Sequence, residues 1–325
     1  PTLTPEPTAT QTLEPTAIPI PGGADQIALL SDNQLYLMNP DGTNLIQIRT
    51  DNFPKSNVQW IPGNRLVYIS RNCAYLLDGS TKAIQEIACF KLDELLEGFR
   101  VSPDGKLVAV SIYKTLNIVP FNVEAFRGAT TRFNLLDMDA SCFYNQYAFR
   151  DVLWSDDGEQ LAAHVLDTEL TSTDQIFLLN VDISNCRNIG PTRVDKFPGL
   201  NFGFYNEDTT KKITSYDWDG DHLFLLNDSV RNDGFGDLYV YDSDTKQEKL
   251  INPIDGVCCY RDATWSPDGK YIMFVFQRFD SSDVSLYYVP YAELGSEKTF
   301  TPIKLPDKFF HPREKPQPVL RPAQP

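Results

Sequence analysis

The sequence lacks the motifs of the common enzyme and metal-binding classes. It has only three histidines, no Cys-x-x-Cys pair and no Gly-x-Ser-x-Gly turn, the element that carries the nucleophile of α/β-hydrolases. Asp217, Asp219 and Asp221 alternate as in a calcium loop, but His222 stands where that loop needs glycine, so we interpret them as an acidic version of a turn. We therefore expect no catalytic residues, no metal and no cofactor.

Positive charge and long apolar runs are also scarce. The 325 residues include 29 Lys and Arg against 44 Asp and Glu, which gives a formal net charge of −15. Nucleic acids and anionic lipid surfaces attract positive patches, so neither is expected as a partner. No run of eighteen apolar residues exists, and no segment of this chain is expected to insert into a membrane.

What the sequence does contain is a short unit that recurs. Its clearest copy, residues 265–275, reads Trp-Ser-Pro-Asp-Gly-Lys followed by Tyr-Ile-Met-Phe-Val. Proline and the Asp-Gly pair predict a tight turn, and the β-branched and aromatic run predicts a strand. All four tryptophans of the chain occupy the same place in this unit, whose copies begin at Trp60, Val101, Trp154, Trp218 and Trp265.

Each copy is followed by further strand-like runs, which gives an antiparallel unit of four strands. Repeats of about 40–65 residues with four strands are typical of β-propellers. We therefore predict an all-β, six-bladed β-propeller of four-stranded antiparallel blades. The blade at residues 27–48 lacks a first strand, and we expect residues 317–320 to supply it and close the ring.

Three turns resemble those of a known family. Residues 39–45, Asn-Pro-Asp-Gly-Thr-Asn-Leu, and the Ser-Pro-Asp-Gly-Lys turns at 102–106 and 266–270 resemble the repeat of TolB-like six-bladed propellers, which also forms the propeller half of prolyl oligopeptidases. The resemblance spans about residues 25–305 and implies a fold that serves many unrelated functions. It also implies that the strand leading to each tryptophan is the innermost of its blade.

Charged residues occur on the strands that lead to the tryptophans of the repeat. Arg150-Asp151 and Arg261-Asp262 each precede a tryptophan of the repeat, and Arg100 occupies a comparable place before Val101. On innermost strands, these five residues would approach the mouth of the channel, where they are candidates for binding a peptide or polar ligand. The alternative, which is the simpler one, is that they pair with one another and hold the blades together.

The two ends of the chain differ from the repeat region. We divide the chain into a Thr/Pro-rich stalk or arm (1–23), the propeller (24–305) and a Pro-rich C-terminal tail (306–325) that contributes to ring closure. Residues 1–21 contain six prolines and six threonines, which predicts an extended spacer. Such stretches are often O-glycosylated. The candidate threonines are Thr2, Thr4, Thr8, Thr10, Thr12 and Thr16.

The six cysteines indicate an oxidising compartment. Cys73 and Cys89 lie eight residues either side of position 81, within a predicted turn, so the two strands place them opposite each other. Cys142 and Cys186 flank the fourth blade and pair either with each other or with Cys258 and Cys259. The last two alternatively form a bridge between neighbours, and spacing leaves these alternatives open.

Taken together, these features predict a non-catalytic, extracytoplasmic protein-interaction or structural module of a bacterial surface. The chain begins at Pro1, without methionine, so we expect a processed product or a part of a longer protein. Its expected partner is a protein, including other copies of itself joined into a filament through the arm. The alternatives are a peptide- or glycan-binding propeller that uses the channel mouth and, less favoured, a hydrolase.

Overall fold

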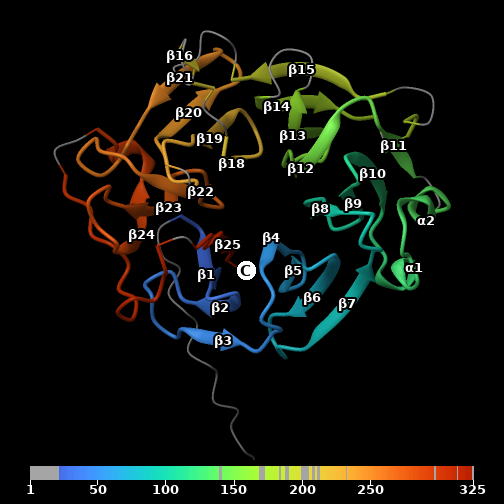
Figure 1. The fold of residues 1–325 in the computed structure, drawn as a ribbon, viewed down its shortest axis with the longest axis horizontal. Coiled ribbons are helices and arrows are strands. Elements are labelled where there is room, and N and C mark those ends of the chain that lie inside the picture. Colours follow the sequence, from blue (N-terminus) through green and yellow to red (C-terminus); the bar gives the residue numbers. More distant parts are fainter. Residues whose placement is uncertain are drawn as a thin grey trace, which may run out of the picture.

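The strands form a ring of six sheets around a central axis (Figure 1), which confirms the predicted all-β, six-bladed propeller. The computed structural model describes residues 22–138, 141–167, 173–182, 184–186, 190–198, 205–206, 209–210, 213–231, 233–295, 298–312 and 314–323. The Thr/Pro-rich segment 1–21, with its six candidate threonines, lies outside the described residues.

Blades two to five each contain four antiparallel strands, which follow one another in chain order from the channel outward. Blade two comprises β4 (Lys55–Ile61), β5 (Arg65–Ser70), β6 (Cys73–Asp78) and β7 (Ile84–Cys89). Blade three comprises β8 (Leu96–Val101), β9 (Leu107–Ile112), β10 (Thr115–Pro120) and β11 (Cys142–Tyr144). Blade four comprises β12 (Ala148–Trp154), β13 (Gln160–Asp167), β14 (Thr173–Asn180) and β15 (Thr192–Phe197). Blade five comprises β18 (Ser215–Trp218), β19 (Leu223–Asn227), β20 (Leu238–Asp242) and β21 (Gln247–Leu250).

Blades one and six flank the point where the ring closes. Blade one comprises β25 (Val319–Pro322), β1 (Ala24–Ser31), β2 (Gln34–Met38) and β3 (Ile46–Ile48). Blade six comprises β22 (Tyr260–Trp265), β23 (Tyr271–Gln277) and β24 (Val284–Pro290), and beside β24 the backbone N–H of Ile303 donates to the carbonyl of Leu286 at 2.8 Å. The smaller elements are α1 (Val123–Phe126), α2 (Arg132–Leu136), the 3₁₀ helix η1 (Tyr291–Glu293) and the pair β16 (Tyr205–Asn206) and β17 (Thr209–Thr210).

The strand missing from the start of blade one comes from the other end of the chain. β25 pairs with β1 in antiparallel register, with Leu320 opposite Ile27 and Val319 opposite Ala28. The N–H of Ala323 donates to the carbonyl of Gly23 at 2.8 Å, which extends the contact beyond the strands. Joining the two ends in one sheet covers the inner edge of β1 and gives blade one its fourth strand.

The recurring turn folds through its own side chains. The Ser266 hydroxyl donates to the Asp268 carboxylate at 2.8 Å, and the same carboxylate accepts the backbone N–H of Lys270 at 3.0 Å. Gly269 takes φ +68°, a conformation that glycine adopts without strain. The turn therefore depends only on residues next to one another in sequence.

The tryptophan of the repeat packs between neighbouring blades. The Trp154 indole N–H donates to the carbonyl of Arg100 at 2.9 Å, and the Trp60 indole N–H donates to that of Val319 at 3.3 Å. In both cases the acceptor is on the innermost strand of the preceding blade. The four-stranded units therefore bury their apolar faces against one another around the ring.

Two of the cysteine pairs considered in the sequence analysis, Cys73–Cys89 and Cys142–Cys186, are bonded as disulfides. Cys73 and Cys89 are opposite each other on β6 and β7 and are bonded, as the turn predicted. Cys142 of β11 is bonded to Cys186, with a Cα–Cα distance of 5.4 Å, so blade three is tied to blade four. Cys258 and Cys259 are paired with each other. Among the described residues, no helix is both long enough and apolar enough to cross a bilayer.

Candidate functional site

Bulges in the innermost strands shape one end of the channel. A bulge adds residues to one strand of a pair, bends it and turns the extra side chains out of the ladder. Asn57, Asp151 and Asp262 each lie three residues before the tryptophan of their repeat, within such a bulge. Asn57 and Asp262 have φ values of +59° and +48°, which asparagine and aspartate tolerate better than most residues. Each bulge therefore places a polar side chain at the same level of the channel.

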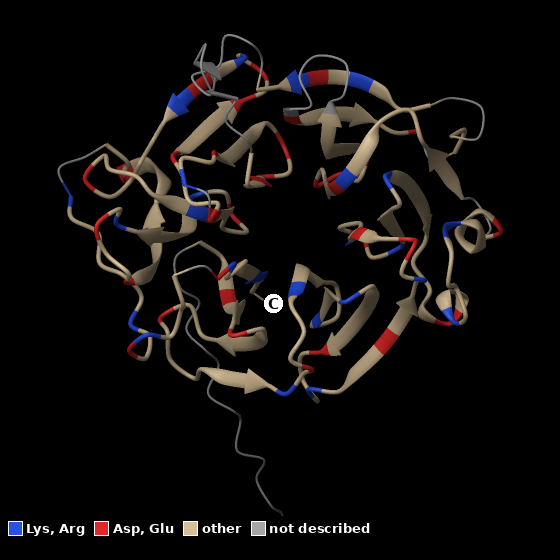
Figure 2. Ribbon diagram, in the orientation of Figure 1, with Lys and Arg blue, Asp and Glu red and all other residues tan. Residues whose placement is uncertain are grey.

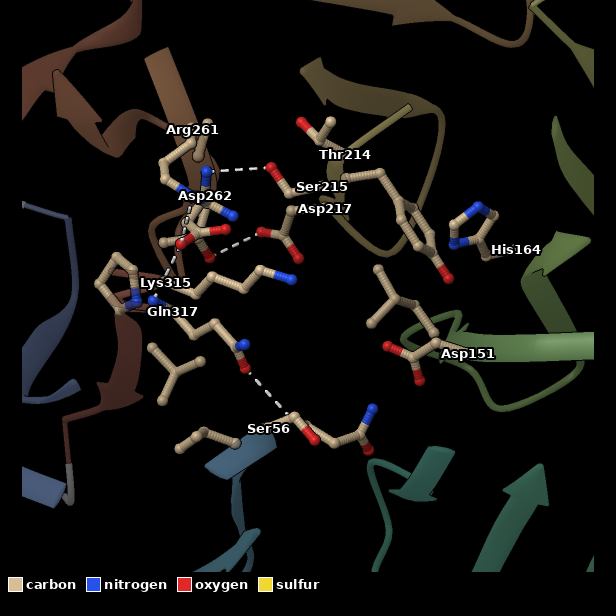
Figure 3. Close-up of a pocket in the computed structure, with 18 of the residues that line it drawn as sticks. Ser56, Asp151, His164, Thr214, Ser215, Asp217, Arg261, Asp262, Lys315 and Gln317 are labelled. Atoms are coloured by element: carbon tan, nitrogen blue, oxygen red, sulfur yellow. Dashed lines mark hydrogen bonds and ion pairs between the residues drawn. The ribbon is translucent and has the colours of Figure 1, made fainter. Parts of the chain in front are cut away.

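These side chains line a cavity of about 250 Å³ at this end of the channel. Figure 3 shows that the labelled residues, which come from several blades, turn toward one common space. Charged residues occur at the outer rim of the ring as well as on the strand ends nearest its axis (Figure 2). We call this cavity the polar mouth. Its ionisable residues include Arg100, Asp151, Asp217, Arg261, Asp262 and Lys315.

Four of the five residues predicted at the channel mouth line this cavity. They are Arg100, Asp151, Arg261 and Asp262. The fifth, Arg150, is not among the lining residues, and its guanidinium is 3.6 Å from the Asp174 carboxylate. Arg150 therefore pairs with a residue outside the lining of this cavity, and its binding role stays a prediction.

Arg100 and Asp151 form a pair between blades three and four. The Arg100 guanidinium reaches the two carboxylate oxygens of Asp151 at 2.9 and 3.2 Å, and its third contact is the Val58 carbonyl of blade two at 3.0 Å. Two parallel hydrogen bonds fix an arginine more firmly than one. This pair matches the alternative in which charged residues hold neighbouring blades together.

Arg261 and Asp262 also bond to each other and to other groups of the protein. The Arg261 side chain is fully buried, its Nε lies 3.2 Å from the Asp262 carboxylate, and its Nη1 donates to the Asp233 carbonyl at 2.9 Å. The same Asp262 oxygen accepts the N–H of Gln317 at 3.2 Å. Because Gln317 immediately precedes the segment that closes the ring, this pair helps to seat the C-terminal strand.

Asp217, like Glu97, is an acidic group of the polar mouth that the sequence analysis missed. It belongs to β18, whereas Asp219 supplies the turn, so the interpretation of Asp217 as a turn residue is wrong. One of its oxygens accepts both the Thr264 hydroxyl and the Trp265 N–H at 2.7 Å. Burial raises the pKa of Asp217 to about 6, although these hydrogen bonds act in the opposite direction.

Asp217 also forms no ion pair with a cation among the described residues. Arg100 is a described cation whose charge acts on it, and Arg100 is already paired with Asp151. No salt bridge between described residues includes Asp217 or Lys315. The Lys315 side chain is exposed and extends into the polar mouth (Figure 3). The cavity thus presents two partly buried acids, Asp217 and Glu97, and one exposed cation, Lys315, that form no salt bridge with a described residue.

A second group of ionisable residues, which includes His164 and Glu97, lines another part of the polar mouth. The His164 Nε2 is 3.3 Å from the Asp174 carboxylate, and its ring packs edge-on against Tyr216 at 5.9 Å between centroids. Burial raises the pKa of Glu97, which the positive charges of Arg150 and Lys114 partly oppose. These groups compensate one another at the wall of the cavity.

Two groups of described residues each bring three potential metal-ligand atoms together. Cys73, Glu86 and Cys89 form the first, but both of its sulfurs are in a disulfide. The second consists of Asp32, His311 and Glu314, with ligand atoms within 4.8 Å of one another. The Glu314 carboxylate already accepts the backbone N–H groups of Asp32 and His311, the latter at 3.0 Å. Backbone hydrogen bonding therefore accounts for this arrangement.

The other end of the channel differs in character from the polar mouth. A cavity of about 380 Å³ there is lined by all four tryptophans of the repeat and by Pro103, Pro267 and Pro322. Three of these tryptophans are almost completely buried between blades. We call this end the tryptophan mouth, and it marks the face of the ring opposite the polar mouth.

Comparisons with known proteins support the fold and no more. No family model matches this chain, and no curated protein matches it. Among solved structures, the chain is similar to the β-propeller domain of Cps50 (Swd1) from Myceliophteria thermophila, with a TM-score of 0.52 and 10% identity over 78% of this chain and 90% of that chain. At this identity the likeness shows a propeller fold alone, and a fold does not by itself imply a function. The resemblance to the TolB-like family remains a prediction.

Proposed function

We propose that the chain is a non-catalytic, extracytoplasmic protein-interaction module of the TolB-like type that binds a basic group of a partner polypeptide at the polar mouth. The observation that carries this proposal is Asp217, a partly buried carboxylate on the cavity wall that forms no salt bridge with any residue that the structure describes. An incoming lysine side chain or amino terminus would supply a cation for it. A charge-assisted hydrogen bond in such a place is stronger than one in water.

The energetics of Asp217 support a binding role. Asparagine could accept the same hydrogen bonds from Thr264 and Trp265 through its side-chain oxygen. The negative charge at this position is therefore unnecessary for those bonds and destabilises the fold at neutral pH, because burial raises the pKa. A group that destabilises the free protein is expected where a ligand stabilises it.

Binding of a cation at Asp217 requires fewer groups of the cavity than hydrolysis does. A glycoside hydrolase uses two carboxyl groups, one as acid and the other as base or nucleophile. In the polar mouth, Asp151 and Asp262 are each held by an arginine. Glu97 is the other carboxylate of the cavity that forms no salt bridge with a described residue, so hydrolysis would need Asp217 and Glu97 to act together, whereas binding of a cation needs only Asp217.

The disulfides support the proposed location. Cys73–Cys89 and Cys142–Cys186 join segments on the outside of the ring, and such bonds persist in oxidising compartments. A bacterial surface is the setting that we propose, with a protein rather than a nucleic acid as the partner. The net charge of −15 supports a partner with basic groups.

Selection from a library of random peptides displayed on phage tests the proposal. We expect the wild-type protein to enrich peptides that share a lysine, an arginine or a free amino terminus. Synthetic versions should bind Asp217→Asn about 10–100-fold more weakly, because one charged hydrogen-bond partner is lost. Phe279→Ser, an exposed position on a loop of blade six, is the matched control and should bind as the wild type does.

Two outcomes would overturn the proposal. Either no peptide is enriched on the wild-type protein, or the enriched peptides bind Asp217→Asn with unchanged affinity. Near pH 5 the carboxylate is mostly protonated, so authentic ligands should also bind more weakly there than near pH 7.5. The Asp217→Asn protein should lack this pH dependence.

A further inference from the structure

An exposed group of large side chains lies on blade three, away from the polar mouth. Leu92, Leu95, Tyr113 and Phe133 are 93%, 55%, 55% and 58% exposed. Together with Arg132 we call them the blade-three patch. Contiguous exposed apolar groups of this kind mark binding surfaces more often than scattered ones do.

Backbone and ring contacts bring the members of the patch together. The N–H of Tyr113 donates to the carbonyl of Leu95 at 2.9 Å. The Arg132 guanidinium lies over the Tyr113 ring at 4.5 Å and near the Phe133 ring at 5.0 Å. The N–H of Lys91, next to Leu92, bonds to the carbonyl of Thr130 at 2.9 Å. Three separate segments thus form one surface.

The patch lies on the polar-mouth face of the ring. β8 begins at Leu96, directly after Leu95, where Glu97 lines the polar mouth. It ends at Val101, which lines the tryptophan mouth. Leu95 and the Tyr113 turn bonded to it are therefore at the same end of the strands as the polar mouth.

The Thr/Pro-rich arm begins on the opposite face. The carbonyl of Gly22, the first described residue, accepts the N–H of Asp268 at 3.3 Å. Asp268 belongs to the turn that follows Trp265, beside the tryptophan mouth. Residues 1–21 are therefore joined to the propeller at the face that does not carry the blade-three patch.

The composition of the arm matches the chemistry of the patch. Proline-rich segments in the polyproline II conformation bind surfaces lined with aromatic side chains, and tyrosine and arginine are frequent at the centres of interfaces. The only charged residues in the arm are Glu6 and Glu14. Among the described residues, no carboxylate forms a salt bridge with Arg132, whose guanidinium is already oriented by the two rings.

We propose that the blade-three patch is the docking surface for the Thr/Pro-rich arm, residues 1–21, of a second copy of this chain. In the polyproline II conformation the arm spans about 65 Å, enough to reach a neighbouring ring. Because the arm and the patch are on opposite faces, the contact is head-to-tail, and such contacts give open filaments when they do not close. The proposal is independent of Asp217, so either can fail alone.

Direct binding of the arm tests the surface. The probe is a fluorescein-labelled synthetic peptide of residues 1–21, titrated by fluorescence anisotropy with protein that begins at Gly22. We expect saturable binding that weakens about tenfold or more in the Tyr113→Ser and Phe133→Ser variants. Phe279→Ser, 74% exposed on the β23–β24 loop of the same face, should bind as the unmodified protein does. Absence of saturable binding would overturn the proposal.

Exchanging the charges of Arg132 and of the glutamates in the arm distinguishes the loss of a specific contact from the loss of folding. The Arg132→Glu variant should bind the unmodified peptide more weakly than the wild-type protein does. A peptide with Glu6→Lys and Glu14→Lys should bind this variant more tightly than the unmodified peptide does. Light scattering of the full chain then identifies whose arm is bound. Assemblies whose mass rises with concentration, and which disappear without residues 1–21, would support the second copy. A strictly monomeric full chain that fails to bind the added peptide would place the arm on its own propeller and overturn the proposal.

Discussion

Replacing Asp217 with asparagine is expected to stabilise the free protein at neutral pH. Burial raises the pKa of Asp217 from 3.8 to about 6, so the folded state holds this proton more tightly than the unfolded state does. The stability that protonation contributes is complete below about pH 4 and is lost as the pH rises through 6. Above about pH 7 the ionised group therefore destabilises the fold by at most about 3 kcal/mol.

The magnitude and its pH dependence can be measured by urea unfolding of the oxidised protein, followed by tryptophan fluorescence. The tryptophans lie between blades, so their emission reports on the packing of the ring. The free energy of unfolding of Asp217→Asn should exceed that of the wild type by about 2–3 kcal/mol near pH 7.5. Below about pH 4 the difference should approach zero, because the wild-type carboxyl group is then neutral.

Asp151→Asn is the matched control because it removes the same charge from the same cavity. Asp151 binds both ends of the Arg100 guanidinium, so its replacement leaves a partly buried arginine without its anion. We expect a loss of about 2 kcal/mol near pH 7.5, which is opposite in sign to the effect at Asp217. A destabilised Asp217→Asn protein at this pH, or a difference that stays constant with pH, would refute the reasoning.

Two further substitutions test how blades three and four are joined. Gly98→Ala would place a Cβ 3.0 Å from an Asp151 carboxylate oxygen, so we expect a loss of about 1–2 kcal/mol, seen as a lower melting temperature by circular dichroism. An unchanged melting temperature would show that the two strands approach each other less closely at this point. Replacing both Cys142 and Cys186 with serine opens a loop of 44 residues, which should lower the free energy of unfolding by about 4 kcal/mol. If the variant is as stable as the reduced wild type, the Cys142–Cys186 disulfide supplies most of the stability that oxidation adds. A variant as stable as the oxidised wild type would contradict the prediction.

Features built from neighbouring residues could be predicted from the sequence. The Ser-Pro-Asp-Gly turn is held by hydrogen bonds between Ser266, Asp268 and Lys270, all within five positions. The Cys73–Cys89 disulfide follows from one turn and the alternation of the strands. Repetition of such local units at a regular spacing was sufficient to predict the six-bladed ring, because each unit must bury its faces against the next.

Features that depend on neighbouring blades required the tertiary structure. Asp217 and its partners Thr264 and Trp265 are more than forty positions apart, so its burial and raised pKa have no sequence signal except the place before Trp218. Arg150 and Asp151 both lie within the bulge of β12, and their adjacency in sequence did not indicate that only Asp151 lines the polar mouth.

The same distinction applies to the cysteines and to the exposed surface. Spacing alone left Cys142 with several partners, and only the packing of blade three beside blade four selects Cys186. The blade-three patch combines three segments whose exposure is decided by what the ring leaves uncovered. Local chemistry therefore determined the repeat and its turns, whereas the distances between blades decided which charges are paired and which surfaces remain open, because those distances follow from the closure of the whole ring.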